Sequence, residues 1–376
     1  MSTDLRVLGG TDVHGERRDV VVRDGTFSAA GSGDATVLDA TGLTVAPGLI
    51  DLQVNGAGGV DVTDEPERLG EIGPVLARYG VTAYLPTVIT SAPAARERAL
   101  ATYAATAAWA GAVPLGVHFE GPMIAAARKG AHPASWLVAP SLDLVAGWSR
   151  EAGVLMVTLA PELAGAVEVV AALTGRGVLV AVGHTEATGA QVAAAEAAGA
   201  RSVTHLFNAM PTITGREPGP VGRALGGDLV AGVIADGHHL DPDTLRTAWR
   251  ALGPARFLAV SDTTAALGMP DGPARLGDQD VVVAAGAVRL EDGTLAGSAA
   301  GLSDCLRVLL ATTGCSVADA VAAATTTPAD LIGDPSRGRL DLGCRGDLVL
   351  LDTSEGRFDV VATVVAGTVV HDRRKG

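Results

Sequence analysis

The chain has 376 residues, of which 48% are apolar and 19% are charged, and 42 acidic against 28 basic side chains give a net charge of −14. This negative charge argues against nucleic acid as a partner, because binding to polyanions depends on Lys and Arg that displace counterions. No apolar run approaches the roughly 18 residues that would suggest a membrane span, so we expect no membrane partner either.

The first residues of the chain place Asp4 and Arg6 where a secretory peptide needs an uninterrupted apolar stretch. We therefore expect no export signal and a cytoplasmic protein. Cys305, Cys315 and Cys344 are odd in number and are not closely paired, so we expect free thiols. Aromatic residues make up only 3% of the chain, which leaves few surfaces for stacking and predicts a ligand held mainly by polar contacts.

The two ends of the chain differ from its middle. Residues 1–46 and 336–376 contain short β-branched runs separated by Gly-rich turns, which are typical of strands. We predict that the two ends pair into one small β-sandwich domain, because pairing would cover sheet edges that each end alone leaves open. The strands are expected at 6–8, 20–22, 37–39, 346–352, 360–365 and 368–371.

The segment 47–335 alternates short β-branched runs with longer Ala-rich stretches of helical periodicity, which is typical of an α/β fold. The helical stretches, such as 66–79, 94–110, 186–198 and 242–252, are long enough for right-handed crossovers between parallel strands. We predict a (β/α)8 TIM-like barrel, with a doubly wound open sheet as the alternative. Its strands are expected at 45–55, 81–89, 113–120, 154–160, 178–184, 202–208, 229–235 and 256–262.

A polar stretch at about 271–297 interrupts the barrel pattern after the eighth predicted strand. It contains two strand-like runs, 281–284 and 287–290, joined by a short turn. We expect a hairpin insertion there.

Polar side chains stand where four of the predicted strands end, namely Glu120, His184, His205 and Asp262. In a parallel barrel the carboxyl ends of the strands surround one mouth, so these groups can meet at one point. Two imidazoles and a carboxylate are a common ligand set for zinc or iron(II), and they leave one coordination position for water. Asp262 would then act as general base toward that water and later protonate a leaving amine.

A structural explanation competes with this hypothesis at each position. A lone histidine at a strand end is more often a hydrogen-bonded core residue than a metal ligand, and the wide sequence separation of these groups is not diagnostic. Their regular placement before small or turn-forming residues favours the functional interpretation. His118 lies two residues before Glu120 on the same strand face, so it either supports Glu120 or is an ordinary buried residue.

Longer motifs around these positions resemble one family. The stretch Gly116-Val-His-Phe-Glu-Gly-Pro-Met-Ile, followed by Lys129-Gly-Ala-His, resembles the N-acetylglucosamine-6-phosphate deacetylases of the amidohydrolase superfamily. The most specific segment is His205-Leu-Phe-Asn-Ala-Met-Pro, which continues to Thr214-Gly-Arg-Glu-Pro-Gly. The similarity spans nearly the whole chain and includes Pro47-Gly-Leu-Ile-Asp, Gly183-His-Thr, Asp236-Gly-His-His, Ser261-Asp and Ala296-Gly-Ser.

The resemblance implies metal-dependent hydrolysis of the acetamide of N-acetylglucosamine 6-phosphate in amino-sugar catabolism. It implies that Glu120, His184 and His205 bind the metal ion and that Asp262 is the catalytic acid and base. It also implies that His132 is catalytic and binds the substrate, because the matching residue contacts the acetyl carbonyl and stabilises the developing oxyanion.

The family's sugar and phosphate contacts correspond to Asn208, the backbone of Ala209, and Arg216. His239 matches a histidine that reaches the phosphate of the neighbouring subunit's substrate, which implies a homodimer. Because the net charge repels a sugar phosphate, capture of the substrate requires such a local positive cluster. Arg216 also has a plainer interpretation, as a solvated loop residue paired with Glu217.

One position departs from the wider superfamily, which often carries His-x-His on the first strand. This chain has Gln53 and Asn55 there, on the same strand face, and neutral amides are poor ligands for a transition metal. We expect one divalent ion per subunit, with Zn²⁺ first and Fe²⁺, Co²⁺ or Mn²⁺ as alternatives.

Three other functions stay open. The enzyme could deacetylate another amino-sugar phosphate, such as N-acetylgalactosamine 6-phosphate, or it could act on N-acyl amino acids or cyclic amides. In a different class, the chain could be a metal-free relative that keeps the barrel as an interaction scaffold. Paired phosphorylated and unphosphorylated amides, together with metal analysis, would separate these hypotheses.

Overall fold

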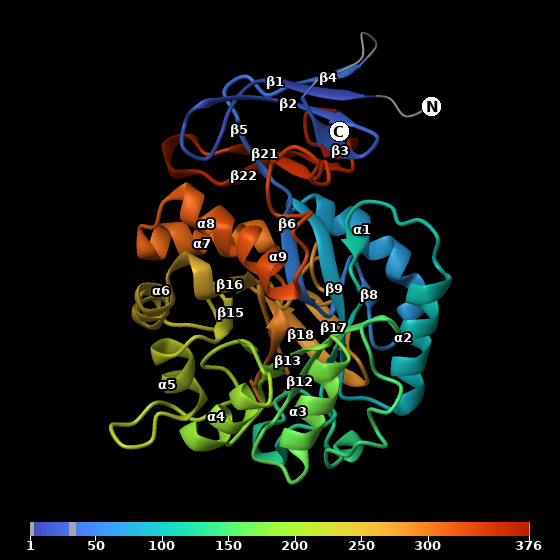
Figure 1. Ribbon diagram of the computed structural model, residues 1–376, viewed down its shortest axis with the longest axis vertical. Coiled ribbons are helices and arrows are strands. Elements are labelled where there is room, and N and C mark those ends of the chain that lie inside the picture. The colour runs from blue at the N-terminus through green and yellow to red at the C-terminus, as the bar shows by residue number, and fades with distance from the viewer. Residues whose placement is uncertain (1–3, 30–34, 376) are drawn as a thin grey trace.

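The structure is a computed structural model that describes residues 4–29 and 35–375, so parts of the predicted N-terminal segment lie outside the described residues. Within those ranges, eight parallel strands form a nearly closed barrel with helices around it (Figure 1), which confirms the predicted α/β barrel over an open sheet. In their order around the barrel, these strands are β6 (Leu49–Val54), β9 (Val81–Ile89), β11 (Val117–Glu120), β12 (Val154–Leu159), β13 (Leu179–Val182), β14 (Ser202–Val203), β15 (Val230–Ile234) and β16 (Phe257–Val260).

The barrel strands are buried because helices cover their outer faces and side chains fill the inside. Every residue of β9 is buried, which explains why these strands appear in the sequence as continuous apolar runs. The helices are α1 (Leu69–Ala77), α2 (Pro93–Ala105), α3 (Ala166–Gly175), α4 (Gly189–Ala197), α5 (Gly219–Gly226), α6 (Pro242–Arg256), α7 (Leu302–Thr313), α8 (Val317–Ala323) and α9 (Thr326–Ile332). Between β11 and β12 the chain instead forms a long loop with short 3₁₀ turns at Ala126–Arg128 and Ala134–Trp136.

Two of the predicted strands are divided at a glycine. The first run gives β5 (Thr44–Pro47) and then β6, because Gly48 lies so close to Thr82 that a Cβ would stand 2.3 Å from its side chain. The third run gives β10 (Val113–Pro114) and β11, separated by Gly116 with φ +147°. Both divisions depend on conformations or contacts that a residue with a side chain disfavours.

The described parts of the two chain ends pair in one sheet, which confirms a separate terminal β domain. β5 links its halves, since it pairs with β1 on one side and antiparallel with β21 on the other, where Val45 faces Leu350. The proposed boundaries at 46/47 and 335/336 stay predictions. The strands are β1 (Leu5–Thr11), β2 (Arg17–Arg23), β3 (Thr26–Ser28), β4 (Thr36–Asp39), β5, β21 (Leu348–Asp352), β22 (Asp359–Val365) and β23 (Thr368–Asp372).

The insertion after β16 is larger than the expected hairpin. The described residues there form a four-stranded antiparallel sheet, and the expected hairpin is its central pair. The outer strands are short and carry Gly and Pro, so they lack the apolar runs that would predict them. The sheet consists of β17 (Gly272–Leu276), β18 (Gln279–Ala284), β19 (Ala287–Arg289) and β20 (Leu295–Ser298).

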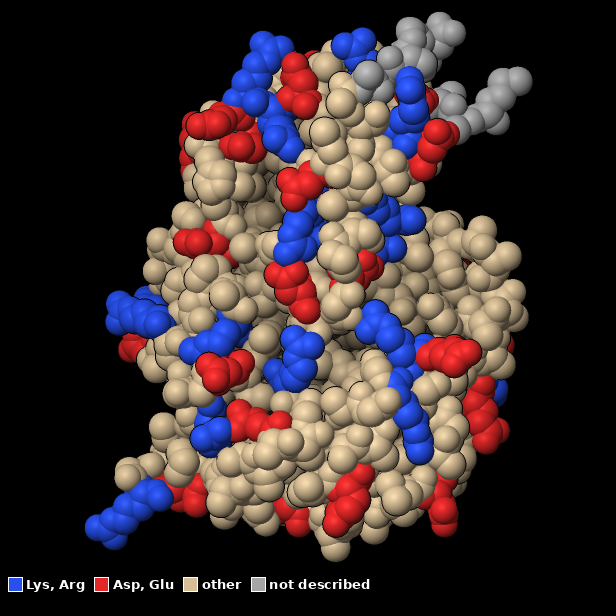
Figure 2. All heavy atoms as spheres, in the orientation of Figure 1, with Lys and Arg blue, Asp and Glu red and all other residues tan. Residues whose placement is uncertain are grey.

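The surface carries both signs of charge. Figure 2 shows one face on which basic and acidic side chains are interspersed, so on this face the negative net charge forms no continuous patch. Across the described ranges, no helix has the length and apolar character that crossing a bilayer requires.

Candidate metal and catalytic site

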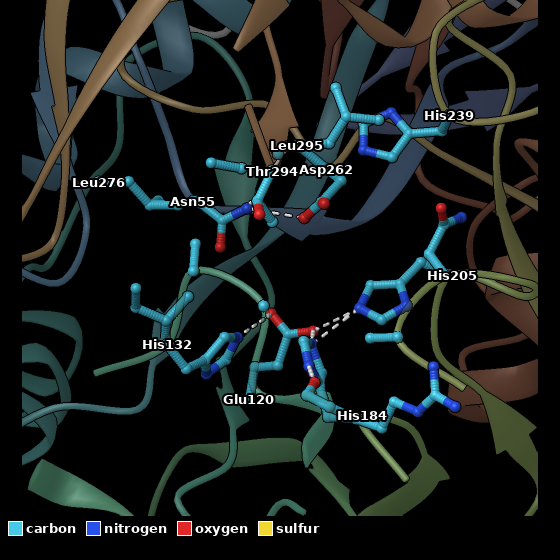
Figure 3. Close-up of a pocket in the computed structure, with 18 of the residues that line it drawn as sticks. Asn55, Glu120, His132, His184, His205, His239, Asp262, Leu276, Thr294 and Leu295 are labelled. Atoms are coloured by element: carbon cyan, nitrogen blue, oxygen red, sulfur yellow. Dashed lines mark hydrogen bonds and ion pairs between the residues drawn. The ribbon is translucent and has the colours of Figure 1, made fainter. Parts of the chain in front are cut away.

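Four polar residues leave the barrel strands at their carboxyl ends and meet inside the barrel mouth (Figure 3). Glu120 is the last residue of β11, and His184, His205 and Asp262 each lie two residues beyond a strand. These last three have φ values of +47°, +30° and +51°, a left-handed conformation that L-residues adopt at a cost of about 1 kcal/mol each. Three of the strands therefore end just before the functional residues, and the turns set the directions of the side chains of His184, His205 and Asp262.

Glu120, His184 and His205 form a compact cluster. The Oε1 atom of Glu120 lies 3.2 Å from His184 Nε2 and 3.1 Å from His205 Nε2, and the two Nε2 atoms are 3.0 Å apart. All three side chains are buried. Burial by itself would raise the pKa of Glu120, but the hydrogen bonds and charges of both imidazoles hold it well below its usual range. The structure thus brings together the three predicted ligands, within 4.8 Å of one another.

The protonation of His184 suits metal binding. Its Nδ1 is 2.7 Å from the carbonyl oxygen of Arg128, and because a carbonyl can only accept, Nδ1 carries the proton. The neutral form of this tautomer, which is the form that binds metal ions, directs its Nε2 lone pair at the cluster, next to a carboxylate oxygen. A cation shared by these atoms would relieve the contact between lone pairs, so the residues present fit a divalent metal ion.

His132 faces the cluster from the loop between β11 and β12, with Nε2 3.9 Å from Glu120 Oε2. The backbone N–H of Thr90 donates to His132 Nδ1 at 3.3 Å, so Nδ1 is an acceptor and Nε2 carries the proton. Burial and the neighbouring His184 lower the pKa of His132 well below its usual value, which keeps the ring neutral. His132 therefore presents an N–H donor near the cluster.

Asp262 stands across the mouth from this donor. Burial raises its pKa to about 7, and the negative charge of Glu120 adds to the effect, while His205, His239 and a hydrogen bond from Asn55 oppose it. Asn55 Nδ2 donates to Asp262 Oδ1 at 2.7 Å. A carboxyl group with a pKa near 7 can both take and give a proton at neutral pH.

These residues line one cavity of about 320 Å³. Asn208, Ala209 and His239 also line it, as does the insertion through residues such as Leu276 and Thr294. His239 lies in the wall of this chain's own cavity, and its expected contact with the neighbouring subunit's substrate stays a prediction. Arg216 is exposed and is not among the described residues that line the cavity. It belongs to the loop that precedes α5, and this loop extends away from the barrel in Figure 1.

His239 has a partner that the sequence did not reveal. Its Nδ1 donates to Asp236 Oδ2 at 2.8 Å, and Asp236 Oδ1 accepts the backbone N–H groups of His238 and His239. Burial by itself would raise the pKa of Asp236, but these bonds and the charge of His239 lower it to about 2. Asp236 therefore stays ionised and fixes the tautomer and direction of the His239 ring.

Other residues of the site were missed or left open by sequence reasoning. Gln53 Nε2 donates to Glu120 Oε1 at 3.3 Å, so the first-strand amide supports the cluster. Arg128 lines the cavity and pairs with Glu186, and the basic pair it forms with Lys129 in an acidic chain was the signal that could have identified it.

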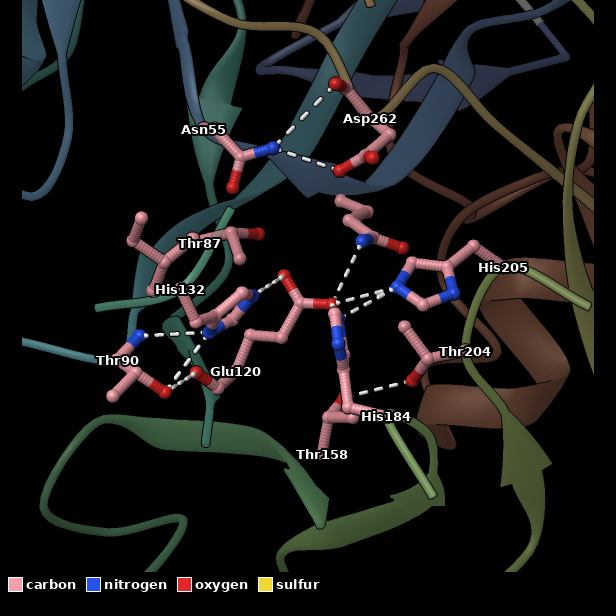
Figure 4. A network of polar contacts seen from close by, with 12 residues as sticks. Asn55, Thr87, Thr90, Glu120, His132, Thr158, His184, Thr204, His205 and Asp262 are labelled. Carbon is pink, nitrogen blue, oxygen red and sulfur yellow. Dashed lines mark hydrogen bonds and ion pairs between the residues drawn. The ribbon is translucent and has the colours of Figure 1, made fainter. Parts of the chain in front are cut away.

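His118 is buried beneath the cluster in a network of threonine hydroxyls that Figure 4 shows in part. Its Nε2 lies 2.8 Å from Thr158 Oγ1, which in turn lies 2.7 Å from Thr204 Oγ1. Burial lowers the pKa of His118 to about 4, so the ring is neutral. His118 is a hydrogen-bonded buried residue, outside the cavity lining among the described residues.

Comparisons with known proteins agree with this architecture. A sequence model of the amidohydrolase family matches residues 44–370. The N-acetylglucosamine-6-phosphate deacetylase of Rattus norvegicus is 39% identical over 350 residues, which cover 88% of this chain and 84% of the rat protein.

Two solved structures are similar over almost their whole length. The N-acetylglucosamine-6-phosphate deacetylase of Pasteurella multocida has a TM-score of 0.90 at 27% identity, covering 97% of this chain and 99% of that one. A mutant of the enzyme from Mycobacterium smegmatis, solved in complex with N-acetyl-D-glucosamine-6-phosphate, has a TM-score of 0.84 at 34% identity, covering 98% of this chain and 99% of that one.

Proposed function

This chain belongs to the amidohydrolase family and, within it, to the N-acetylglucosamine-6-phosphate deacetylases, and we propose that it hydrolyses the acetamide of N-acetylglucosamine 6-phosphate to glucosamine 6-phosphate and acetate. One observation carries the proposal: a cluster of Glu120, His184 and His205 shares a cavity with a proton donor, His132, and a carboxyl group of raised pKa, Asp262. That combination is what metal-assisted amide hydrolysis requires.

Glu120, His184 and His205 would hold one divalent ion, with Zn²⁺ as our first choice and Fe²⁺, Co²⁺ or Mn²⁺ as alternatives that accept the same donors. When bound, the ion polarises the amide carbonyl and lowers the pKa of the attacking water. The family membership supports metal dependence, and the imidazole and carboxylate donors support zinc.

The remaining steps belong to this chain's own side chains. Asp262 takes a proton from the attacking water and then gives it to the leaving nitrogen, and a pKa of about 7 suits both transfers. His132 donates its Nε2 hydrogen to the carbonyl oxygen, where negative charge develops as the water attacks. One such donor contributes roughly 3 kcal/mol to the stability of a transition state of this kind.

Binding of the phosphorylated sugar falls to Asn208, Ala209, Arg216 and His239. Three of these line the cavity, and Arg216 is exposed in the loop before α5. In the homodimer that the family resemblance implies, His239 would reach the phosphate of the neighbouring subunit's substrate. We place the enzyme in the cytoplasm, because a doubly charged sugar phosphate does not cross a bilayer unaided.

The proposal is tested with zinc-loaded protein and a panel of N-acetylated hexosamines, with and without a 6-phosphate. We expect the highest kcat/KM with N-acetylglucosamine 6-phosphate, and we expect Asp262→Asn to keep its metal, measured by elemental analysis, while losing nearly all turnover. A higher kcat/KM with N-acetylgalactosamine 6-phosphate would identify that sugar as the substrate instead. An Asp262→Asn variant with near-normal kcat would remove Asp262 from its role, and a metal-free protein inactive after supplementation with divalent ions would favour a scaffold.

A further inference from the structure

Asn55, which follows the first barrel strand, carries a polar atom with no partner in the described structure. The residue is 3% exposed and lines the cavity. Its Oδ1 is buried and makes no hydrogen bond. Buried acceptors without a partner are rare in native proteins, and those in a ligand cavity are often completed by the ligand.

The orientation of the Asn55 amide follows from its surroundings. Nδ2 lies 2.7 Å from Asp262 Oδ1 and 3.5 Å from the backbone oxygen of Asp262. Both neighbours are acceptors when Asp262 is ionised, so the NH₂ group must face them and Oδ1 must face away. Figures 3 and 4 both show Oδ1 directed away from Asp262, on the side where His132 and Glu120 lie.

We propose that Asn55 Oδ1 binds the N–H of the substrate acetamide and thereby turns the nitrogen lone pair toward Asp262. The inference rests on the proposed function. Because Asp262 protonates the leaving nitrogen, that nitrogen lies beside Asp262, and therefore also beside the residue that donates to Asp262 Oδ1. The acetamide nitrogen bears one hydrogen, and Asn55 presents one unused acceptor.

The proposal gives the two ends of the amide separate partners. The carbonyl oxygen accepts from His132, which is a donor, and the N–H donates to Asn55, which offers an acceptor. Once water has added to the carbonyl, the nitrogen is tetrahedral, with its hydrogen held by Asn55. Its lone pair then accepts the proton of Asp262, the C–N bond breaks, and the bonding electrons leave with the amine.

The test compares the amide substrate with its ester analogue, 2-O-acetyl glucose 6-phosphate, in which oxygen replaces the N–H. We measure the ratio of kcat/KM for amide over ester in zinc-loaded wild type and in Asn55→Ala. Asn55→Ala also removes the donor that orients Asp262, and this loss slows the amide more than the ester because an amine leaves only after protonation, so a control that lacks the same donor is needed. We expect the ratio to fall about 10- to 100-fold, the range for losing a buried hydrogen bond.

Asn55→Asp is the matched control, because it keeps an acceptor oxygen but loses the donor to Asp262. We expect its activity to fall with both substrates while its amide-to-ester ratio stays about 10-fold or more above that of Asn55→Ala, since an acceptor remains for the N–H, and equal ratios in the two variants would overturn the proposal. An Asn55→Ala variant with the wild-type ratio would overturn the proposal and leave Asn55 as a residue that only positions Asp262. A wild-type protein inactive on both substrates would instead refute the proposed function.

A second measurement leaves Asn55 intact and does not depend on the folding of its variants. Substrate labelled with ¹⁵N in the acetamide is bound to zinc-loaded Asp262→Asn, and the N–H proton is followed by NMR. A hydrogen bond to the buried acceptor predicts a downfield shift and slower exchange with solvent than in the free sugar. A bound N–H whose shift and exchange match those of the free sugar would overturn the proposal.

Discussion

Asp51 in β6 is a buried carboxyl group whose ionisation makes stability depend on pH. Its Oδ2 accepts from Ser261 Oγ, and its Oδ1 accepts the backbone N–H groups of Gln53 and Ser261 at 3.3 Å. Burial nevertheless raises the pKa of Asp51 from 3.8 to about 6. Because the folded state holds this proton more tightly than the unfolded chain does, the stability that the proton gives is complete below pH 4 and is lost as the pH rises through 6.

The size of this effect follows from the shift. A difference of about 2 pKa units corresponds to roughly 3 kcal/mol between the protonated and ionised folded states. Asp51→Asn has no charge to bury, and its amide oxygen can still accept from Ser261. We therefore expect the free energy of unfolding of Asp51→Asn, relative to wild type, to rise by about 3 kcal/mol between pH 4 and pH 8.

Equilibrium urea unfolding of metal-free wild type and Asp51→Asn across this range measures the difference. Titration of the metal ligands affects both proteins and cancels. Asp61→Asn is a useful comparison, because burial also raises the pKa of Asp61 to about 6, while its carboxylate accepts backbone N–H groups from Thr63, Asp64 and Gly277. Asp61→Asn should show the same pH trend. It should also lose more free energy of unfolding at every pH, because an amide cannot accept all three of these backbone N–H groups. A difference between Asp51→Asn and wild type that is independent of pH would refute the reasoning.

Three further predictions concern catalysis. Arg216→Ala should raise KM far more for N-acetylglucosamine 6-phosphate than for the unphosphorylated sugar in steady-state assays, and an equal effect on both would exclude phosphate recognition. Asp236→Asn removes the carboxylate that orients His239. KM for the phosphorylated sugar should therefore rise roughly 10-fold, which is the loss expected for a charged hydrogen bond. A fall in kcat that is larger than the rise in KM would contradict a role in binding. The value of kcat/KM should rise with pH as Asp262 ionises. A bound cation favours the carboxylate form, so the midpoint should lie below the pKa of about 7 that Asp262 has without the metal. A midpoint well above 7 would contradict the assignment of Asp262.

The sequence predicted the barrel because its strands are buried on both sides and appear as apolar runs. It overestimated the lengths of the strands at the site: the run predicted at 202–208 contains β14, which ends at Val203. His205 and Asp262 follow their strands in left-handed turns, and hydrophobic periodicity does not record the point where a backbone turns. The family resemblance identified these residues through their motifs. The directions of their side chains are set by the left-handed turns, which the motifs do not describe.

Contacts between distant strands were beyond the reach of sequence patterns. The roles of Asn55 and Asp51 depend on residues more than 200 positions away, at the seam where β16 meets β6. Thr90, which sets the tautomer of His132, likewise lies on a different element, 42 positions away in the sequence. Composition and spacing identify which groups can carry chemistry, but hydrogen-bond direction appears only when the strands are placed side by side.

The pairing of β5 with β21 also bears on how the protein is made. The ribosome releases the amino-terminal strands first, yet β5 finds its neighbour only when the segment around Leu350 has been synthesised. Until that segment emerges, therefore, the edge of β5 is open to other nascent chains. A chaperone that shields this edge should therefore raise the yield of correctly folded protein.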